Sequence, residues 1–182
     1  MSEPALPKCV LFDLGGVIID VDMGSVVATF ASNRIDTSVA EAWYKAAAID
    51  AFEKGQIGPA AFGEAIVMEL ALDCTAAQFL ERVEDIHRGL FAGAAELLAG
   101  LASRTHVACF SNINQLHWAS QCRDLGIDRF FETHILSFQL GKRKPEPAAF
   151  MAAAERWSLA PGEIMFFDDR AENVEGALAA GF

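Results

Sequence analysis

Residues 8–13 (KCVLFD), followed directly by Leu14-Gly15-Gly16, decide the fold of this chain. This apolar run is short, ends in an acid and leads into two glycines, which predicts a fully buried strand followed by a tight loop. Segments 106–111 (HVACFS), 133–138 (THILSF) and 163–168 (EIMFFD) have the same character. We therefore expect four buried strands that belong to one sheet.

Helical patterns separate these strands. Segments 93–104, 114–124, 146–157 and 170–180 read as helices, several with apolar residues at helical spacing. Strands that alternate with helices predict an α/β fold, with a Rossmann-like parallel sheet covered by helices on both faces.

The stretch from residue 23 to residue 88 interrupts the alternation. Apolar residues recur there at three- or four-residue spacing, which predicts four helices without an intervening strand. The connector 53–59 (EKGQIGP) separates two of them. We expect an α/β core formed by residues 1–22 and 89–182, and an inserted helical-bundle cap at 23–88. The apolar sets are Val26/Val27/Phe30, Ala42/Trp43/Ala46, Phe62/Ile66/Leu70 and Phe79/Val83/Ile86.

The composition limits the classes of partner. The chain has 182 residues, a net charge of −11 and 53% apolar residues, which excludes disorder and argues against nucleic acid or an anionic membrane as partner. No secretory signal or membrane-length apolar run is visible, and the four cysteines lack metal-ligand spacing, so we expect a cytoplasmic protein. An anionic substrate would need a local metal or lysine.

Polar residues follow the strands at four points. Asp13 ends the first strand before its glycine loop, and Ser111-Asn112 end the second. Lys144 lies in a basic turn, GKRKPEP, where Pro145 restricts the backbone. Asp168-Asp169 end the last strand, and their mutual repulsion calls for a cation such as Mg²⁺. Taken singly, each motif also fits a helix cap or a solvated turn.

Together, the order acid, hydroxyl, lysine and acid pair resembles the haloacid dehalogenase superfamily of phosphatases. FDLGGV, the SN pair, KRKPEP and FFDDRAEN match its four motifs across nearly the whole chain. The bacterial α-D-glucose-1-phosphate phosphatase-like subgroup is the most similar, together with the N-terminal domain of soluble epoxide hydrolase. The resemblance also implies a cap of the type inserted after the first strand, and a further strand after the last helix.

The resemblance implies a Mg²⁺-dependent hydrolysis of a small phosphorylated metabolite, such as a sugar-1-phosphate, through an aspartyl-phosphate. The implied residues are Asp13 as nucleophile; Ser111, Asn112 and Lys144 for the phosphoryl group; Asp13, the Gly15 carbonyl and Asp169 for the metal; and Asp168 and Asn173 in support. Positioning and charge neutralisation are what phosphoryl transfer needs.

One position departs from the family pattern. Most of these phosphatases carry a second aspartate, the general acid, two residues after the nucleophile, where this chain has Gly15. Asp20, Asp22 or Glu53 could substitute, although each has a simpler structural interpretation, and Asp22 and Glu53 are expected to be solvated surface acids. Without an acid, substrates with acidic leaving groups are favoured, such as sugar-1-phosphates, aryl phosphates and acyl phosphates. The connector at 53–56 is expected to lie over the site and to influence substrate choice.

Two other functions fit the same motifs. A 2-haloacid dehalogenase also attacks through an aspartate but needs no metal, and the acid pair at the last strand argues against it. A non-catalytic module that binds phosphate or a partner would explain Gly15. The sequence leaves the physiological substrate and the oligomeric state open.

Overall fold

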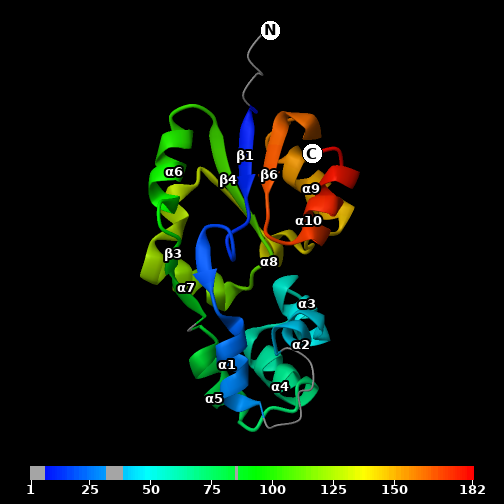
Figure 1. Cartoon of the computed structure of the whole chain (residues 1–182). Helices are drawn as coiled ribbons and strands as arrows, with labels where there is room; N and C mark the ends of the chain where they lie inside the picture. The colour runs from blue at the N-terminus through cyan, green and yellow to red at the C-terminus, as the bar shows by residue number, and fades with distance from the viewer. Residues whose placement is uncertain (1–6, 32–38, 85) are drawn as a thin grey trace.

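The computed structural model of the chain describes residues 7–31, 39–84 and 86–182. Its main sheet contains strands β1 (Cys9–Phe12), β4 (His106–Ser111), β5 (Thr133–Leu136) and β6 (Ile164–Phe167). They are parallel, in the order β5-β4-β1-β6 (Figure 1). The parallel sheet predicted from the sequence is therefore confirmed. With β1 in the middle, Asp13 lies between the ends of β4 and β6.

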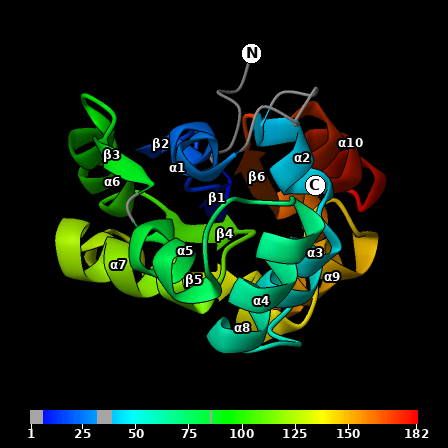
Figure 2. The ribbon, with the colours of Figure 1, turned by 90° about the horizontal axis from the view of Figure 1, so that it is seen from below.

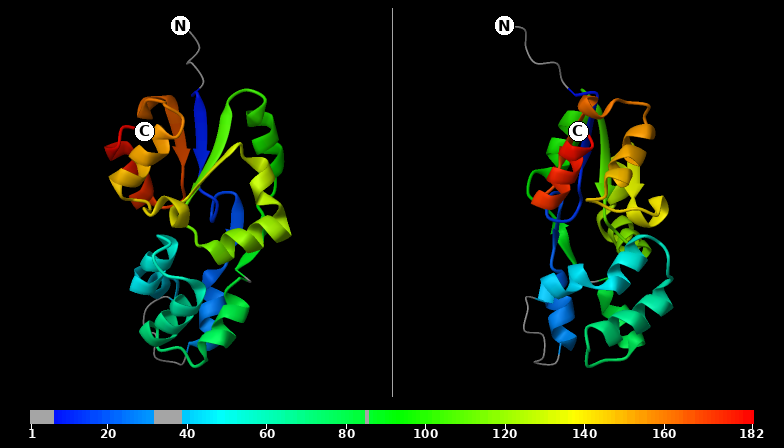
Figure 3. Two further views of the ribbon diagram at one scale, coloured as in Figure 1. Left: turned by 180° about the vertical axis from the view of Figure 1, so that it is seen from behind. Right: turned by 90° about the vertical axis from the view of Figure 1, so that its right-hand side faces the viewer.

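Helices cover both faces of this sheet (Figures 1 and 3). Val10 and Phe12 pack against α6 (Ala94–Ala102) and α7 (Gln115–Leu125), whereas Cys9 and Leu11 pack against α9 (Pro147–Glu155) and α10 (Ala171–Ala179). Successive strand residues point to opposite faces, so a continuous apolar run is what a sheet covered on both sides requires. Two 3₁₀ turns, Ile127–Phe130 and Pro161–Glu163, precede β5 and β6.

The run at 133–138 ends as a helix and not as a strand. Strand β5 stops at Leu136, and Ser137 begins the short helix α8 (Ser137–Leu140). The Ser137 hydroxyl donates to the carbonyl of Ile113 and accepts from its N–H, at 3.0 and 2.9 Å. This long-range pair turns the chain out of the sheet, and residue type alone does not reveal it.

A second, two-stranded sheet connects the core to the inserted segment. Strands β2 (Ile19–Val21) and β3 (His87–Leu90) pair antiparallel, with an irregularity between Asp20 and Val21. The sequence analysis did not predict these strands, since each has only three or four residues and their pairing partners are far apart in the chain. Together they form the ribbon through which the chain leaves the core and returns.

The elements described between β2 and β3 are helices joined by turns, and these helices lie beneath the main sheet (Figures 1 and 2). They are α1 (Met23–Phe30), α2 (Val39–Lys45), α3 (Ala47–Glu53), α4 (Pro59–Glu69) and α5 (Ala76–Val83). They enclose a separate hydrophobic core that includes Phe62, whose ring stacks on Phe52 at 4.2 Å between centroids. These helices lie within residues 23–88, the range predicted for the cap, and we refer to them as the cap; the domain bounds themselves stay a prediction.

The cap contains one more helix than the four predicted, because the pattern at 42–46 spans a break. Helix α3 starts at Ala47, where the Glu69 carboxylate of α4 accepts from the N–H groups of Ala47 and Ala48, at 2.6 and 2.9 Å. A carboxylate at a helix N-terminus satisfies free N–H groups and interacts favourably with the helix dipole. The N-terminus of α3 is thus capped by a side chain from another helix. In the described parts of the chain, no helix is long and apolar enough to cross a membrane.

Candidate active site

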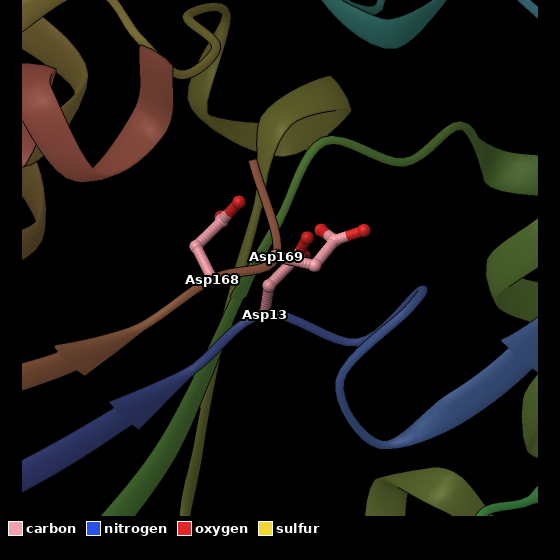
Figure 4. A group of neighbouring side chains, drawn as sticks. All are labelled: Asp13, Asp168 and Asp169. Carbon is pink, nitrogen blue, oxygen red and sulfur yellow. The ribbon is translucent and has the colours of Figure 1, made fainter. Parts of the chain in front are cut away.

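Three carboxylates meet at the carboxyl ends of the two neighbouring strands β1 and β6. Asp13 directly follows β1, and its N–H donates to the Phe167 carbonyl at 2.9 Å, while Asp168 and Asp169 follow β6. Figure 4 shows the three side chains extending beyond the strand ends on the same side. One oxygen from each lies within 4.8 Å of the others. The topology therefore brings together the acids that the sequence analysis selected.

The Lys144 ammonium is the cation nearest this cluster. Its Nζ lies 2.5 Å from Asp168 Oδ2 and 3.1 Å from Asp13 Oδ1. The Lys144 side chain is completely buried, and the ring centroids of Phe110 and Phe166 lie 5.3 and 5.2 Å from Nζ. A lysine is rarely buried unless it is paired, so its charge is directed at the acids.

The Asp168 carboxylate accepts hydrogen bonds from several neighbouring groups of the site. Its Oδ1 accepts from the Arg170 N–H at 3.0 Å and from Asn173 Nδ2 at 2.8 Å. Because Lys144 holds its other oxygen, both oxygens of Asp168 are already engaged. Asp168 is therefore placed to fix Lys144, while Asp13 and Asp169 retain more capacity to bind a cation.

The cluster carries more negative charge than Lys144 can offset. Burial raises the pKa of Asp13, as does the nearby Asp168, whereas Lys144 lowers it. Burial and then Asp168 also raise the pKa of Asp169. Oxygen ligands with excess negative charge are the donor set that Mg²⁺ prefers, so these residues fit the expected metal.

The loop after Asp13 admits Asp169 because Gly16 has no side chain. Gly16 has a φ of +78°, and a Cβ there would lie 2.3 Å from Asp169 Oδ2. The Leu14 N–H donates to Asp13 Oδ1 at 2.7 Å, which fixes the orientation of that carboxylate. Gly15 lines the cavity beside them. Gly16 thus allows the close approach of Asp169, whereas the approach of an anion to the backbone N–H groups of this loop stays a prediction.

Ser111 and Asn112 lie at the end of β4 and line the same cavity. Asn112 also holds the backbone of Lys144: its Nδ2 donates to the Lys144 carbonyl and its Oδ1 accepts the Lys144 N–H, both at 2.8 Å. Asn112 therefore positions Lys144, a role that the sequence did not indicate. Phosphate binding by Ser111 and Asn112 stays a prediction.

The cap forms part of the cavity, which has a volume of about 110 Å³. Trp43, Tyr44 and Glu53 line it from the cap, and Arg143 lines it from the core. The expectation that Glu53 is a solvated surface acid is wrong, since only 6% of this residue is exposed. Glu53 ends α3, and Arg143 of the core lies 3.1 Å from its Oε2.

Polar contacts attach the cap to the core beside this cavity. Lys54 Nζ lies 2.8 Å from a carboxylate oxygen of Glu146, and the Arg170 guanidinium lies over the Tyr44 ring, 4.3 Å from its centroid. The connector at 53–56 was expected to lie over the site, and its first residue, Glu53, lines the cavity; an influence of the connector on substrate choice stays a prediction. Tyr44 and Arg170 were not predicted as site residues, because their contact joins elements distant in sequence.

Comparisons with known proteins agree with this geometry. A family model described as hydrolase, haloacid dehalogenase-like hydrolase, matches residues 7–181. A D-ribitol-5-phosphate phosphatase of Bacteroides thetaiotaomicron is 25% identical, over 96% of this chain and 89% of the relative. A phosphorylated carbohydrates phosphatase of Thermotoga maritima is 26% identical, over 96% and 82%.

A solved structure has the same architecture. The crystal structure of a haloacid dehalogenase family enzyme of Bacteroides thetaiotaomicron, in complex with magnesium and inorganic phosphate, superposes with a TM-score of 0.80. It is 28% identical and covers 97% of this chain and 91% of that chain. The family match over nearly the whole sequence and the shared fold lead to one conclusion. The chain belongs to the haloacid dehalogenase-like hydrolases.

Proposed function

We propose that this hydrolase is a Mg²⁺-dependent phosphatase of small phosphorylated carbohydrates that acts through an aspartyl-phosphate. The observation that carries the proposal is the buried Lys144 ammonium, 3.1 Å from Asp13 and 2.5 Å from Asp168, within a cluster of three carboxylates. The two relatives named as phosphatases of phosphorylated carbohydrates support the substrate class.

Asp13 is placed to attack phosphorus. The Leu14 N–H and Lys144 hold its Oδ1, so the carboxylate has a fixed orientation at the floor of the cavity. One carboxylate oxygen forms a bond to phosphorus while the bond to the leaving oxygen breaks, and that oxygen takes the electron pair and a proton. Water then attacks the phosphorus of the acyl phosphate, which releases phosphate and restores Asp13.

The surrounding residues neutralise and orient the phosphoryl group. Asp13, Asp169 and the carbonyl of Gly15 would hold Mg²⁺, which supplies positive charge for the phosphoryl oxygens. Lys144 adds a second positive charge beside Asp13, and Ser111 and Asn112 offer a hydroxyl and an amide at the end of β4. Asp168 and Asn173 keep Lys144 in place.

Within this class, sugar-1-phosphates are our first candidates. An anomeric hydroxyl is a better leaving group than a primary alcohol, and Gly15 supplies no acid beside the nucleophile. Dehalogenation is less consistent with the site, because Asp169 adds a negative charge beside the nucleophile that a reaction without a metal does not need.

The test is hydrolysis of p-nitrophenyl phosphate and of sugar phosphates, with Mg²⁺ and with a chelator. We expect turnover that requires Mg²⁺ and is abolished in Asp13→Asn, which is nearly isosteric and should stay folded by circular dichroism. Asp20→Asn, on β2, is the control and should retain activity. Turnover that survives chelation, or equal rates in Asp13→Asn and the wild type, would refute the proposal.

A further inference from the structure

The leaving oxygen needs a proton, and the structure decides between the three acids that could supply it. Asp22 is the N-cap of α1, where its Oδ1 accepts the Ser25 N–H at 3.0 Å and its Oδ2 pairs with Arg88. The contact with Ser25, and after it that with Arg88, lowers the pKa of Asp22. A lowered pKa opposes proton donation. Asp20 lies on β2 and is not one of the described residues that line the cavity. Glu53 remains.

Glu53 lies on the side of the cavity where a leaving group must depart. Attacking and leaving oxygens are roughly in line in phosphoryl transfer, so attack by Asp13 from the core directs the leaving oxygen toward the cap. Glu53, with Trp43 and Tyr44, forms the cap side of the cavity that Asp13 lines from the core. The Glu53 side chain is therefore close to where that oxygen departs.

The Glu53 carboxyl group also has capacity for a ligand. Its Oε2 is buried and forms an ion pair with Arg143 Nη2 at 3.1 Å, but it accepts no well-aligned hydrogen bond in the described structure. A buried polar atom without a hydrogen bond is costly, so such an atom in a cavity indicates a group completed by a ligand. A substrate oxygen in the cavity would complete it.

We propose that Glu53 is the catalytic acid that protonates the leaving oxygen; this rests on the proposed phosphatase activity. The proton passes from the Glu53 carboxyl group to the leaving oxygen as its bond to phosphorus breaks. The carboxylate that forms lies beside Arg143, which stabilises its charge. In the second step, Glu53 takes a proton from the attacking water and is restored. The acid is thus carried by the cap, while the nucleophile belongs to the core.

The charges that face Glu53 are consistent with this role. Burial raises the pKa of Glu53, and the negative charges of Asp13 and Asp50 act in the same direction. Arg143 and Arg170 oppose them. The net shift of the Glu53 pKa is upward, toward the protonated form that an acid needs, whereas the nearby arginines limit the penalty for losing the proton.

Gly15 itself has little room for an acid. A Cβ at Gly15 would lie 3.3 Å from Val21 Cγ2, so a larger side chain there would have to displace Val21. An acid supplied from the cap side avoids that contact. With such an acid, the absence of a side chain at Gly15 no longer disfavours substrates with poor leaving groups, such as phosphate esters of primary alcohols.

The experiment is a series of aryl and alkyl phosphates, for which the single-turnover rate is plotted against the pKa of the leaving group. We expect a shallow slope for the wild type and a steep negative slope for Glu53→Gln. For a primary alkyl phosphate, the variant should lose about 10²- to 10⁴-fold in rate, and for p-nitrophenyl phosphate only a few-fold. Glu64→Gln, an exposed acid on α4, is the matched control and should match the wild type.

Each outcome separates the two proposals. Retained turnover of p-nitrophenyl phosphate by Glu53→Gln shows that the variant folds and that the phosphatase assignment stands. A wild type inactive on every ester with Mg²⁺ contradicts the proposed function. Equal loss on all esters, or no loss on any, overturns the role of Glu53. The alkaline limb of the pH–rate profile on alkyl phosphates should also disappear in Glu53→Gln, because that limb reports deprotonation of the acid.

Discussion

His117 should make the stability of this protein fall as the pH falls below neutrality. Its ring connects core and cap: Nε2 donates to the Val83 carbonyl of α5 at 2.8 Å, and Nδ1 accepts from Asn114 Nδ2 at 3.0 Å. Asn114 cannot reverse its amide without losing the cap of α7, since its Oδ1 accepts the N–H groups of Leu116 and His117. A proton on Nδ1 would therefore face an N–H donor.

The magnitude follows from the pKa of His117. Burial, above all, lowers it from its ordinary value of 6.5 to about 4. Between these values the unfolded state binds more protons than the folded state, so the free energy of unfolding decreases as the pH falls. The loss from this group amounts to about 2 kcal/mol between pH 7 and pH 5, and to about 3 kcal/mol well below pH 4.

Urea unfolding of the wild type and of His117→Gln at pH 7, 6 and 5 measures this contribution. At pH 7 the variant is expected to be less stable than the wild type, because its contact with Val83 changes. Between pH 7 and pH 5, however, its free energy of unfolding should fall by about 2 kcal/mol less than that of the wild type. Parallel losses in the two proteins would refute the reasoning. An NMR titration in which the His117 ring takes up a proton near pH 6.5 would refute it as well.

Two further predictions concern the metal and the cap. Asp169→Asn should weaken Mg²⁺ affinity by about 10- to 100-fold, measured by calorimetry, whereas the exposed Glu172→Gln should not; unchanged affinity would remove Asp169 from the metal site. Gly55 has a φ of +67°, and a Cβ there would lie 2.2 Å from the Phe138 carbonyl oxygen. Gly55→Ala should therefore destabilise the protein by about 1–3 kcal/mol. It should also impair hydrolysis of alkyl phosphates more than hydrolysis of aryl phosphates. Gly58→Ala, with open space around it, is the matched control, and equal effects of both variants would contradict this interpretation.

The core could be predicted from the sequence because its signals are local. A buried parallel strand is an apolar run, and the ends of such strands meet at one edge, so Asp13, Ser111, Asp168 and Asp169 could be placed together before any coordinates. Lys144 was found by its contrast with an acidic chain and by the proline that follows it. These are the residues to which we assign the chemistry, and the four polar residues at the strand ends are positioned by the topology of the sheet.

What the sequence did not show depends on contacts between distant segments. The break between α2 and α3 is made by Glu69, which lies 22 residues from Ala47. The burial of Glu53 results from docking of the cap on the core, so its acidic side chain looked like a surface residue. The sequence did not show that Asn112 also holds the Lys144 backbone, because that contact spans 32 residues. Polar side chains of this kind cannot be assigned without their partners.

The ribbon of β2 and β3 bears on how this protein can diversify. The inserted segment leaves the core at Val21 and returns at His87, which are paired across the ribbon. Because its two ends are adjacent, a segment of another length or shape can replace it without altering the order of the main sheet, at little cost in loop-closure entropy. Asp13 and Lys144, which belong to the core, would be unchanged by such a replacement. If Glu53 donates the proton, an exchange of this one segment alters both the molecule admitted and the range of bonds that can be broken.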